Sequence, residues 1–249
     1  MSKIALITGA SSGIGEATAR KLADSGWDLI LAARRFERLE KLVSTFKVET
    51  HLLQLDVRNR AAVDSAISGL PERWRNIELL VNNAGLSRHL LKLHEGDPVA
   101  WDEMIDTNVK GLLYVSRAVI PGMVARGRGH VINVGSIAGH EVYPNGNVYC
   151  ASKFAVDALT KGMMMDLVDT PIRVSTVDPG LVETEFSMVR FYGDTERAEK
   201  VYQGLRPLTG DDIAETIEWI ASRPEHIQIA QVVILPKSQA GAMVVHRKQ

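Results

Sequence analysis

A tyrosine and a lysine stand four positions apart, at Tyr149 and Lys153. If this stretch is helical, the phenol and the ammonium lie on one face, a single turn apart. A tyrosine near its reference pKa of about 10 exchanges protons poorly at neutral pH, and a fixed cation beside it moves that pKa toward the working range. The two residues are therefore a candidate acid/base pair. The alternative is that they share a helix face by coincidence and have no catalytic role.

A glycine-rich stretch runs from Thr8 to Gly15 with the spacing G-x-x-x-G-x-G. This differs from the commoner dinucleotide spacing G-x-G-x-x-G, but the physical reasoning is the same. Glycines let the backbone turn sharply and let a pyrophosphate approach the N–H groups at a helix start, where the dipole favours negative charge. A tight turn without a ligand is the alternative. The expected cofactor contacts in this stretch are Gly9, Ser11, Ser12, Gly13, Ile14 and Gly15.

The second predicted strand ends at Arg34 and Arg35, with no acidic residue before Glu37. An acidic residue at this point would bind the ribose 2′-hydroxyl of NAD and repel a 2′-phosphate. Two guanidinium groups instead suit a phosphate, both as charges and as bidentate donors. The sequence therefore favours NADP over NAD, with ordinary helix-start charges as the alternative.

Two further strand ends carry candidate cofactor contacts. Asp56 and Val57 follow the third predicted strand, where an adenine edge would lie, and Asp56 could accept from the adenine amine or cap the next helix. The turn from Asn82 to Gly85 ends the fourth strand and could border the nicotinamide ribose or merely terminate the strand. The expected contacts in this turn are Asn83, Ala84 and Gly85.

Apolar runs of strand length alternate with longer amphipathic stretches, and this alternation must position the residues above. Strands are predicted over 4–8, 28–33, 50–55, 78–82, 129–134, 172–177 and 228–235. Helices are predicted over 13–25, 36–45, 60–70, 148–168 and 211–221, and one or two long helices over 101–126, where Pro121 could introduce a kink. The alternation, with near-continuous apolar strands, predicts a parallel sheet covered on both faces. We expect one doubly wound α/β domain spanning residues 1–249.

The composition excludes several other classes of protein. The chain has 249 residues, of which 45% are hydrophobic and 24% charged, so it can bury a sizeable core and is not disordered. A net charge of -1 without long runs of one sign gives no case for nucleic acid or a membrane surface. The single cysteine permits no intrachain disulfide, and the scattered histidines predict no metal site. Neither a signal peptide nor a spanning segment is recognised, so a cytoplasmic protein is expected.

Together these motifs resemble the short-chain dehydrogenase/reductase family, in the same order and over nearly the whole chain. The matching elements are Thr8 to Gly15, Asn82 to Gly85, Asn108, Ser136, Tyr149, Lys153 and Pro179-Gly180. The resemblance implies a Rossmann-type domain with a seven-stranded parallel sheet, NAD(P)-dependent alcohol/carbonyl chemistry and a homotetramer. A closer resemblance, to the NADP-dependent 3-hydroxy acid dehydrogenases that act on serine and allo-threonine, rests on four segments. These are 55–60, 74–77, 185–191 and 245–247.

The resemblance also implies what the site residues do. Tyr149 would exchange a proton with the substrate oxygen, while Lys153 would lower the Tyr149 pKa and hold the nicotinamide ribose. Ser136 would hydrogen-bond the substrate oxygen, and Asn108 would hold a water that connects Lys153 to solvent. The backbone after the sixth strand and one hydroxyl would meet the nicotinamide carboxamide. The residues expected there are Pro179, Gly180, Val182 and Thr184.

Residues 181–206, which we call the lid segment, lack a clean period and have the composition of an active-site lid. A hydroxy acid such as serine, allo-threonine or 3-hydroxypropionate needs a cation for its carboxylate. The candidates are Arg190, His140, Arg88 and His89, and Arg190 leads because it lies in 185–191, a segment that carries the closer resemblance.

Two alternatives to a hydroxy acid dehydrogenase remain open. The segments 87–89 and 139–141 are more polar and bulkier than is usual in the subgroup, so a broad NADPH-dependent carbonyl reductase is the alternative enzyme. A non-catalytic NADP-sensing protein is the alternative of another class. Ser136, Tyr149 and Lys153, all present, argue against sensing.

Overall fold

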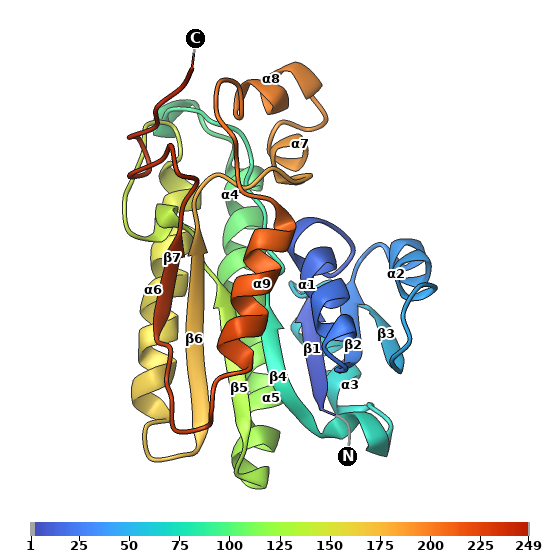
Figure 1. Ribbon diagram of the computed structural model, residues 1–249. Helices are drawn as coiled ribbons and strands as arrows, with labels where there is room; N and C mark the ends of the chain where they lie inside the picture. The colour runs from blue at the N-terminus through green and yellow to red at the C-terminus, as the bar shows by residue number, and fades with distance from the viewer. Residues whose placement is uncertain (1–2, 249) are drawn as a thin grey trace.

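The computed structural model describes residues 3–248, and its centre is one parallel sheet in the order β3-β2-β1-β4-β5-β6-β7 (Figure 1). The strands are β1 Ile4–Thr8, β2 Asp28–Ala33, β3 Thr50–Gln54, β4 Ile77–Asn82, β5 Gly129–Val134, β6 Ile172–Pro179 and β7 Gln231–Ile234. The predicted α/β class and the seven-stranded parallel sheet are confirmed. The strand order reverses between β1 and β4, and open sheets of this kind bind ligands outside the carboxyl ends of the strands at such a point.

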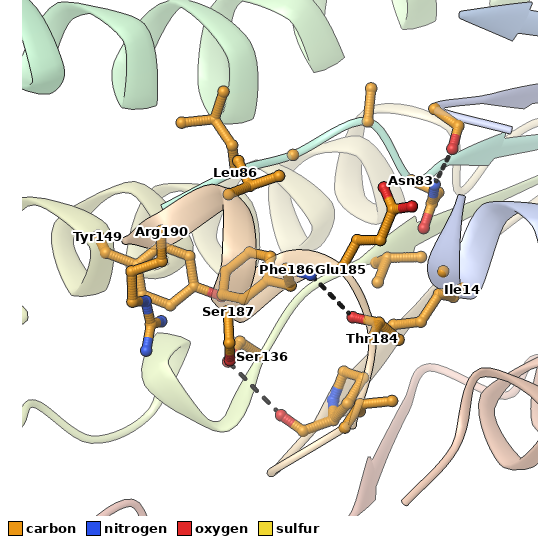
Figure 2. Close-up of a pocket in the computed structure, with 18 of the residues that line it drawn as sticks. Ile14, Asn83, Leu86, Ser136, Tyr149, Thr184, Glu185, Phe186, Ser187 and Arg190 are labelled. Atoms are coloured by element: carbon orange, nitrogen blue, oxygen red, sulfur yellow. Dashed lines mark hydrogen bonds between the residues drawn. The ribbon is translucent and has the colours of Figure 1, made fainter. Parts of the chain in front are cut away.

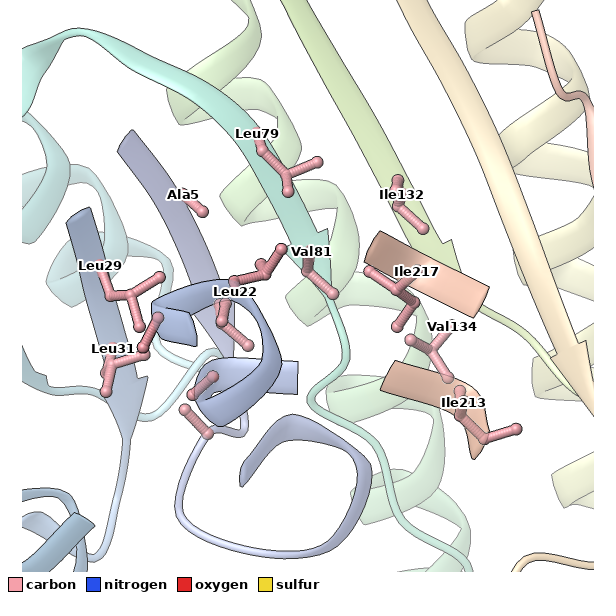
Figure 3. Packing of buried hydrophobic residues seen from close by; sticks show 14 of the residues in the cluster. Ala5, Leu22, Leu29, Leu31, Leu79, Val81, Ile132, Val134, Ile213 and Ile217 are labelled. Carbon is pink, nitrogen blue, oxygen red and sulfur yellow. The ribbon is translucent and has the colours of Figure 1, made fainter. Parts of the chain in front are cut away.

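Side chains of each strand alternate between two buried layers, as the period of a strand requires. Ala5 and Ile7 face the layer that contains Leu22 of α1 (Gly13–Asp24) and Ile217 of α9 (Gly210–Ala221). Figure 3 shows Ala5, Leu22 and Ile217 in this layer. Leu6 faces the opposite layer, which includes side chains of α3 (Arg60–Ser68) and α5 (Leu112–Arg126). Both faces of the central strands are covered, and β1 and β2 are buried along their whole length.

The remaining helices are α2 Phe36–Val43, α4 Pro98–Ile105, α6 Asn147–Asp166, α7 Phe186–Arg190 and α8 Thr195–Lys200. Several helix starts follow from local side chains. Asn59 accepts from the Ala62 N–H at the start of α3, and Thr209 and Asp212 form a reciprocal capping box at the start of α9. None of the helices within residues 3–248 is both long enough and apolar enough to span a membrane.

The stretch 101–126, predicted as one or two helices, forms two, and the break does not lie at Pro121, where a kink was expected. α4 ends at Ile105, a π-helical turn covers Asp106–Gly111, and α5 continues through Pro121 to Arg126. The interruption therefore lies at Asn108 and not at the proline. Single π turns inside helices are frequent at functional sites.

Candidate active site

A cavity of about 430 Å³ lies at the carboxyl ends of β1, β2, β4, β5 and β6. The glycine-rich turn, both arginines after β2, Ser136, Tyr149, Lys153 and much of the lid segment line it. Every catalytic and cofactor residue expected from the sequence lines this cavity except Gly15 and Asn108, and of the candidates for a substrate cation only Arg190 does. The sheet thus brings together residues that are more than a hundred positions apart in the chain.

The glycine-rich turn is held in place by Asn83. The Asn83 amide donates to the carbonyl of Thr8 at 2.9 Å and to that of Gly9 at 3.2 Å. A Cβ on Gly15 would lie 2.4 Å from the Asn83 Nδ2 and 2.4 Å from the Gly9 oxygen, so no side chain fits there. Gly15 therefore serves the packing of the turn against β4, while its neighbours face the cavity.

Arg35 joins the end of β2 to the glycine-rich turn. Its Nη2 donates to the Ser12 hydroxyl at 2.7 Å and its Nη1 to the Glu185 carboxylate at 3.0 Å. Arg38 donates to both oxygens of the same carboxylate, at 2.7 and 2.9 Å. Burial raises the pKa of Glu185, but hydrogen bonds from Arg38 and Arg35 outweigh this and leave the pKa below its ordinary value. Glu185 is therefore an anion held between two guanidinium groups beside Ser12.

Asp56 lines the cavity, but its carboxylate faces Arg58. The guanidinium of Arg58 donates to Asp56 at 2.7 to 3.0 Å. Burial raises the pKa of Asp56, while Arg58 lowers it by hydrogen bonds and charge and sets the net direction downward. The alternative role of Asp56 as the cap of the following helix was wrong, because Asn59 caps α3. The contact of Asp56 with an adenine amine stays a prediction.

Tyr149, on α6, is 8% exposed and reaches into the cavity near Ser136 and Arg190 (Figure 2). The Ser136 hydroxyl accepts from the Ala138 N–H at 3.1 Å. Burial raises the pKa of Tyr149; the charge of Arg190 and a hydrogen bond with Ser136 lower it without reversing the direction. The expected lowering of this pKa is therefore wrong for the structure, in which burial dominates.

Lys153 lies on the same face of α6 as Tyr149, with its Nζ 6.0 Å from the centre of the tyrosine ring. Its ammonium donates to the carbonyl of Val134 at 2.9 Å. Burial lowers the pKa of Lys153 to about 8, against the opposing charge of Asp178. The spacing argument thus predicted the shared face correctly, and the lysine titrates near the neutral range.

Asn108 lies behind the cavity wall. Its amide accepts from the Leu86 N–H at 2.8 Å and donates to the Leu86 carbonyl at 2.9 Å and the Ser152 hydroxyl at 3.0 Å. The side chain is therefore occupied in fixing the segment after β4 against α6. A water held by Asn108 would have to use the backbone of the π turn, and that relay stays a prediction.

Arg190 lies against the aromatic rings of the cavity. Its Cζ is 5.4 Å from the ring centre of Tyr149 and 5.0 Å from that of Phe186. Nη2 donates to the Tyr143 hydroxyl at 3.4 Å, and the buried Nε has no hydrogen-bond partner. No ion pair within residues 3–248 includes Arg190. A cation without an anionic partner thus faces the proposed proton donor.

The other candidates for a substrate cation lie elsewhere. His140 is excluded as a residue of this cavity: its Nε2 is 2.9 Å from the Asp178 carboxylate, and it does not line the cavity wall. Arg88 donates to Glu103 at 2.6 Å and to the Val189 carbonyl at 2.6 Å. The His89 N–H donates to the Arg190 carbonyl at 3.0 Å. Arg88 and His89 therefore anchor α7 and do not line the cavity.

Sequence reasoning missed several lining residues, chiefly Tyr143, Glu185, Phe186, Tyr202 and Gln239. The Tyr202 hydroxyl donates to the Val182 carbonyl at 2.8 Å, and Gln239 accepts from the Leu181 N–H at 2.9 Å. Glu185 and Phe186 lie in a segment that already carried the closer resemblance, which was a usable signal. Gln239 comes from the C-terminal segment, and no motif marks it.

Comparisons with known proteins agree with this geometry. A profile of the short chain dehydrogenase family matches residues 3–193. The chain is 47% identical to the NADP-dependent 3-hydroxy acid dehydrogenase YdfG of Salmonella typhi, over 98% of this chain and 99% of the relative. It is 44% identical to sulfoacetaldehyde reductase 2 of Chromohalobacter salexigens over 96% of both chains. The closed form of serine dehydrogenase complexed with NADP+ superposes with a TM-score of 0.94 at 44% identity, covering 99% of this chain and 100% of that one.

Proposed function

The chain belongs to the short chain dehydrogenase family, and from this premise we propose that it is an NADP-dependent oxidoreductase for 3-hydroxy acids. The reaction interconverts an alcohol, secondary or primary, and the corresponding carbonyl compound. The expected substrates are 3-hydroxy acids such as serine, allo-threonine or 3-hydroxypropionate. The relatives named for NADP-dependent 3-hydroxy acid dehydrogenation support this proposal.

The cavity residues fit NADP. Gly9 and Gly13 have φ values of 67° and 55°, and a Cβ on Gly9 would lie 2.9 Å from the backbone of Ala84. The turn therefore presents bare backbone at the start of α1, where N–H groups and the helix dipole suit a pyrophosphate. Arg34 and Arg35 line the same cavity and supply the charges for a 2′-phosphate.

Three side chains would carry the proton chemistry. The Tyr149 hydroxyl donates a proton to the substrate oxygen in reduction and accepts it in oxidation, while Ser136 donates a hydrogen bond to that oxygen. Lys153 places a positive charge on the same helix face and favours the phenolate when Tyr149 has given up its proton. The bound nicotinamide supplies or accepts the hydride.

The observation that carries the substrate class is the unpaired guanidinium of Arg190 beside Tyr149. The half-buried guanidinium of Arg190 has no counter-ion, and a substrate carboxylate would supply an anionic partner for it. The carboxylate would then lie on Arg190 while the hydroxyl carbon lies near Tyr149. Such a two-point attachment selects small acids that carry a nearby hydroxyl.

The test is NADP+ reduction measured with serine, allo-threonine, threonine, 3-hydroxypropionate and a simple secondary alcohol. We expect activity with the acids, and Arg190→Ala should raise KM for them about tenfold or more. KM for a neutral alcohol or ketone should change little. Arg197→Ala, an exposed arginine of the same lid segment, is the matched control. Activity with the simple alcohol alone would rule out the acid-substrate proposal.

A second candidate substrate follows from the same guanidinium. A sulfonate is also an oxyanion that Arg190 could bind, and one relative is a sulfoacetaldehyde reductase. NADPH oxidation with sulfoacetaldehyde belongs in the same substrate panel. The broad carbonyl reductase is favoured instead if neutral ketones match the acids in kcat/KM.

We also propose that the whole chain, residues 1–249, forms one domain in which residues 181–206 act as a lid. Its contacts with Tyr149 through Phe186 and Arg190 support this role. A homotetramer is proposed from the family resemblance, and the exposed Met165 and Val168 at the end of α6 are consistent with an interface. A cytoplasmic location is proposed because the only cysteine is unpaired.

A further inference from the structure

Glu185 occupies an unusual place for an acidic residue in an NADP-binding cavity. Its carboxylate lies 3.0 Å from Arg35 and 2.7 Å from Arg38, and it lines the same cavity as Ser11, Ser12 and Arg35. In Figure 2 it lies in the middle of the pocket view, between Tyr149 on one side and Ile14 on the other. Arg35, one of the two guanidinium groups that favour NADP, is thus already paired with an anion of the protein.

The charges at this point oppose one another. A 2′-phosphate carries roughly -1.5 to -2 charges at neutral pH. It would meet the carboxylate of Glu185 across the Arg35 guanidinium, and like charges at such separations repel each other. The Glu185 side chain is 44% exposed, so the carboxylate can turn away into water. Moving a fully buried carboxylate away from its cationic partners would cost more free energy than moving this partly exposed one.

We propose that Glu185 occupies the 2′-phosphate subsite as a built-in competitor, and that NADP binds by displacing it from Arg35. Glu185 thereby moderates the preference for NADP over NAD, since NAD has no phosphate to compete with it. This inference rests on the proposed function, because it assumes that Arg35 receives the 2′-phosphate.

Displacement of Glu185 would also affect the substrate end of the cavity, because the backbone connects Glu185 to residues there. Glu185 directly precedes α7, and Phe186 and Arg190 of that helix lie against the Tyr149 ring. The Phe186 N–H is held by the Thr184 hydroxyl at 3.2 Å. Release of Glu185 therefore loosens a short segment that ends at the proposed carboxylate-binding arginine.

Binding measurements on Glu185→Gln test the competition without reference to turnover. Glutamine keeps the shape and removes the charge. The dissociation constants of 2′,5′-ADP, 5′-AMP, NADPH and NADH are measured by calorimetry for the wild type, for Glu185→Gln and for Glu183→Gln. Glu183 is an exposed acid two residues earlier and is the matched control. We expect Glu185→Gln to bind 2′,5′-ADP and NADPH about fivefold more tightly, with 5′-AMP and NADH within about twofold. The gain should shrink at high salt, because ions screen partly exposed charges.

Unchanged or weaker binding of 2′,5′-ADP by Glu185→Gln would overturn the competition, since the carboxylate would then be neutral or helpful to the phosphate. An equal gain in 2′,5′-ADP affinity for Glu183→Gln would also overturn the proposal. The loss of any nearby negative charge would then explain the effect. A Glu185→Gln variant that binds NADH as well as NADPH would instead contradict the proposed cofactor, because the competing charge is then absent. Hydrogen exchange of residues 182–190 gives a second readout. It should be faster with 2′,5′-ADP than with 5′-AMP in the wild type, and the absence of that difference would contradict displacement.

Discussion

At the scale of single residues, the site is a set of charged and hydroxyl groups whose neighbours alter their chemistry. Tyr149 is buried, and its pKa is raised, with Arg190 and Ser136 as the main opposing influences. Lys153 has a pKa lowered to about 8 by burial. Burial keeps the proton on Tyr149, which is the form that donates to a carbonyl oxygen, whereas oxidation of an alcohol needs the phenolate form.

Tyr149→Phe removes the hydroxyl and keeps the ring that packs against Phe186. We expect kcat to fall about 100-fold or more, because the substrate oxygen loses its proton donor. NADPH binding should stay within about threefold of the wild type, since the fold and the arginines are untouched. Turnover and cofactor titration on the same preparation check this. Retention of most of the turnover would show that another group carries the proton.

Arg34→Ala combined with Arg35→Ala tests the selection of the cofactor. The double variant loses charge-assisted hydrogen bonds to a phosphate, and we expect NADPH binding to weaken about 100-fold. NADH binding should weaken far less. The ratio of the two dissociation constants is the measurement, and an equal loss for both cofactors would remove the assignment of these arginines to the 2′-phosphate.

At the scale of secondary structure, polar side chains hold the catalytic elements in register. Asn83 ties the glycine-rich turn to the end of β4, and Asn108 ties the next segment to α6 through Ser152. Arg88 and the His89 backbone hold α7 from the same segment. The residues after β4 thus position the cofactor turn, the catalytic helix and the lid segment together.

The pairing of β5 with β6 buries one titratable group, and this predicts a pH dependence of stability. His130 on β5 lies 2.7 Å from the Ser175 hydroxyl on β6, and burial lowers the His130 pKa from 6.5 to about 3. Below pH 6.5 the unfolded chain takes up a proton on His130 that the folded chain does not take up until about pH 3. The neutral, buried His130 therefore does not reduce the free energy of unfolding above pH 6.5. Below pH 6.5, proton uptake by the unfolded chain progressively reduces it.

We expect His130 to lower the free energy of unfolding by about 1.4 kcal/mol for each pH unit below 6.5. His130→Asn should remove this part of the slope, whatever its effect on stability at neutral pH. Urea unfolding between pH 7 and pH 4.5 measures both slopes. His94→Asn, at an exposed site, is the control. Identical slopes for wild type and His130→Asn would contradict the prediction.

At the scale of the whole molecule, the reversal of strand order between β1 and β4 determines where the cofactor-binding and catalytic residues come together. The carboxyl ends of the strands open on one edge of the sheet, and the C-terminal segment returns to that edge. Gln239 holds the start of the lid segment, and Arg247 donates to the carbonyls of Val201 and Gln203 near its end. The cavity is thus closed by contacts between distant parts of the chain.

Association of copies is a prediction at this scale. Phe154, Met165 and Val168, on α6 or just after it, are 41%, 75% and 81% exposed. If they form the interface of a homotetramer, Phe154→Glu combined with Met165→Glu should reduce the molar mass measured by light scattering, because charges would be buried between subunits. Leu93→Glu, at another exposed apolar residue, should leave it unchanged. A wild type that is monomeric at micromolar concentration would reject the tetramer.

The amino-acid sequence by itself determined the parallel sheet and most of the cavity wall. Strand periodicity and apolar runs are local, and four-residue spacing on a helix places Tyr149 and Lys153 on one face wherever the helix lies. Strand ends of a parallel sheet share an edge, so motifs after β1, β2 and β4 could be expected to meet. All but two of the predicted catalytic and cofactor residues do line one cavity.

Only the tertiary structure decided which groups stand beside them. Burial, and not the nearby lysine, sets the direction of the Tyr149 pKa. His140 pairs with the buried carboxylate of Asp178. Glu185 pairs with Arg35, which lies 150 residues earlier in the sequence. Such contacts depend on how loops without periodicity pack, and on desolvation that no spacing records. The chemistry of the residues was therefore visible in the sequence, whereas their electrostatic partners required the fold.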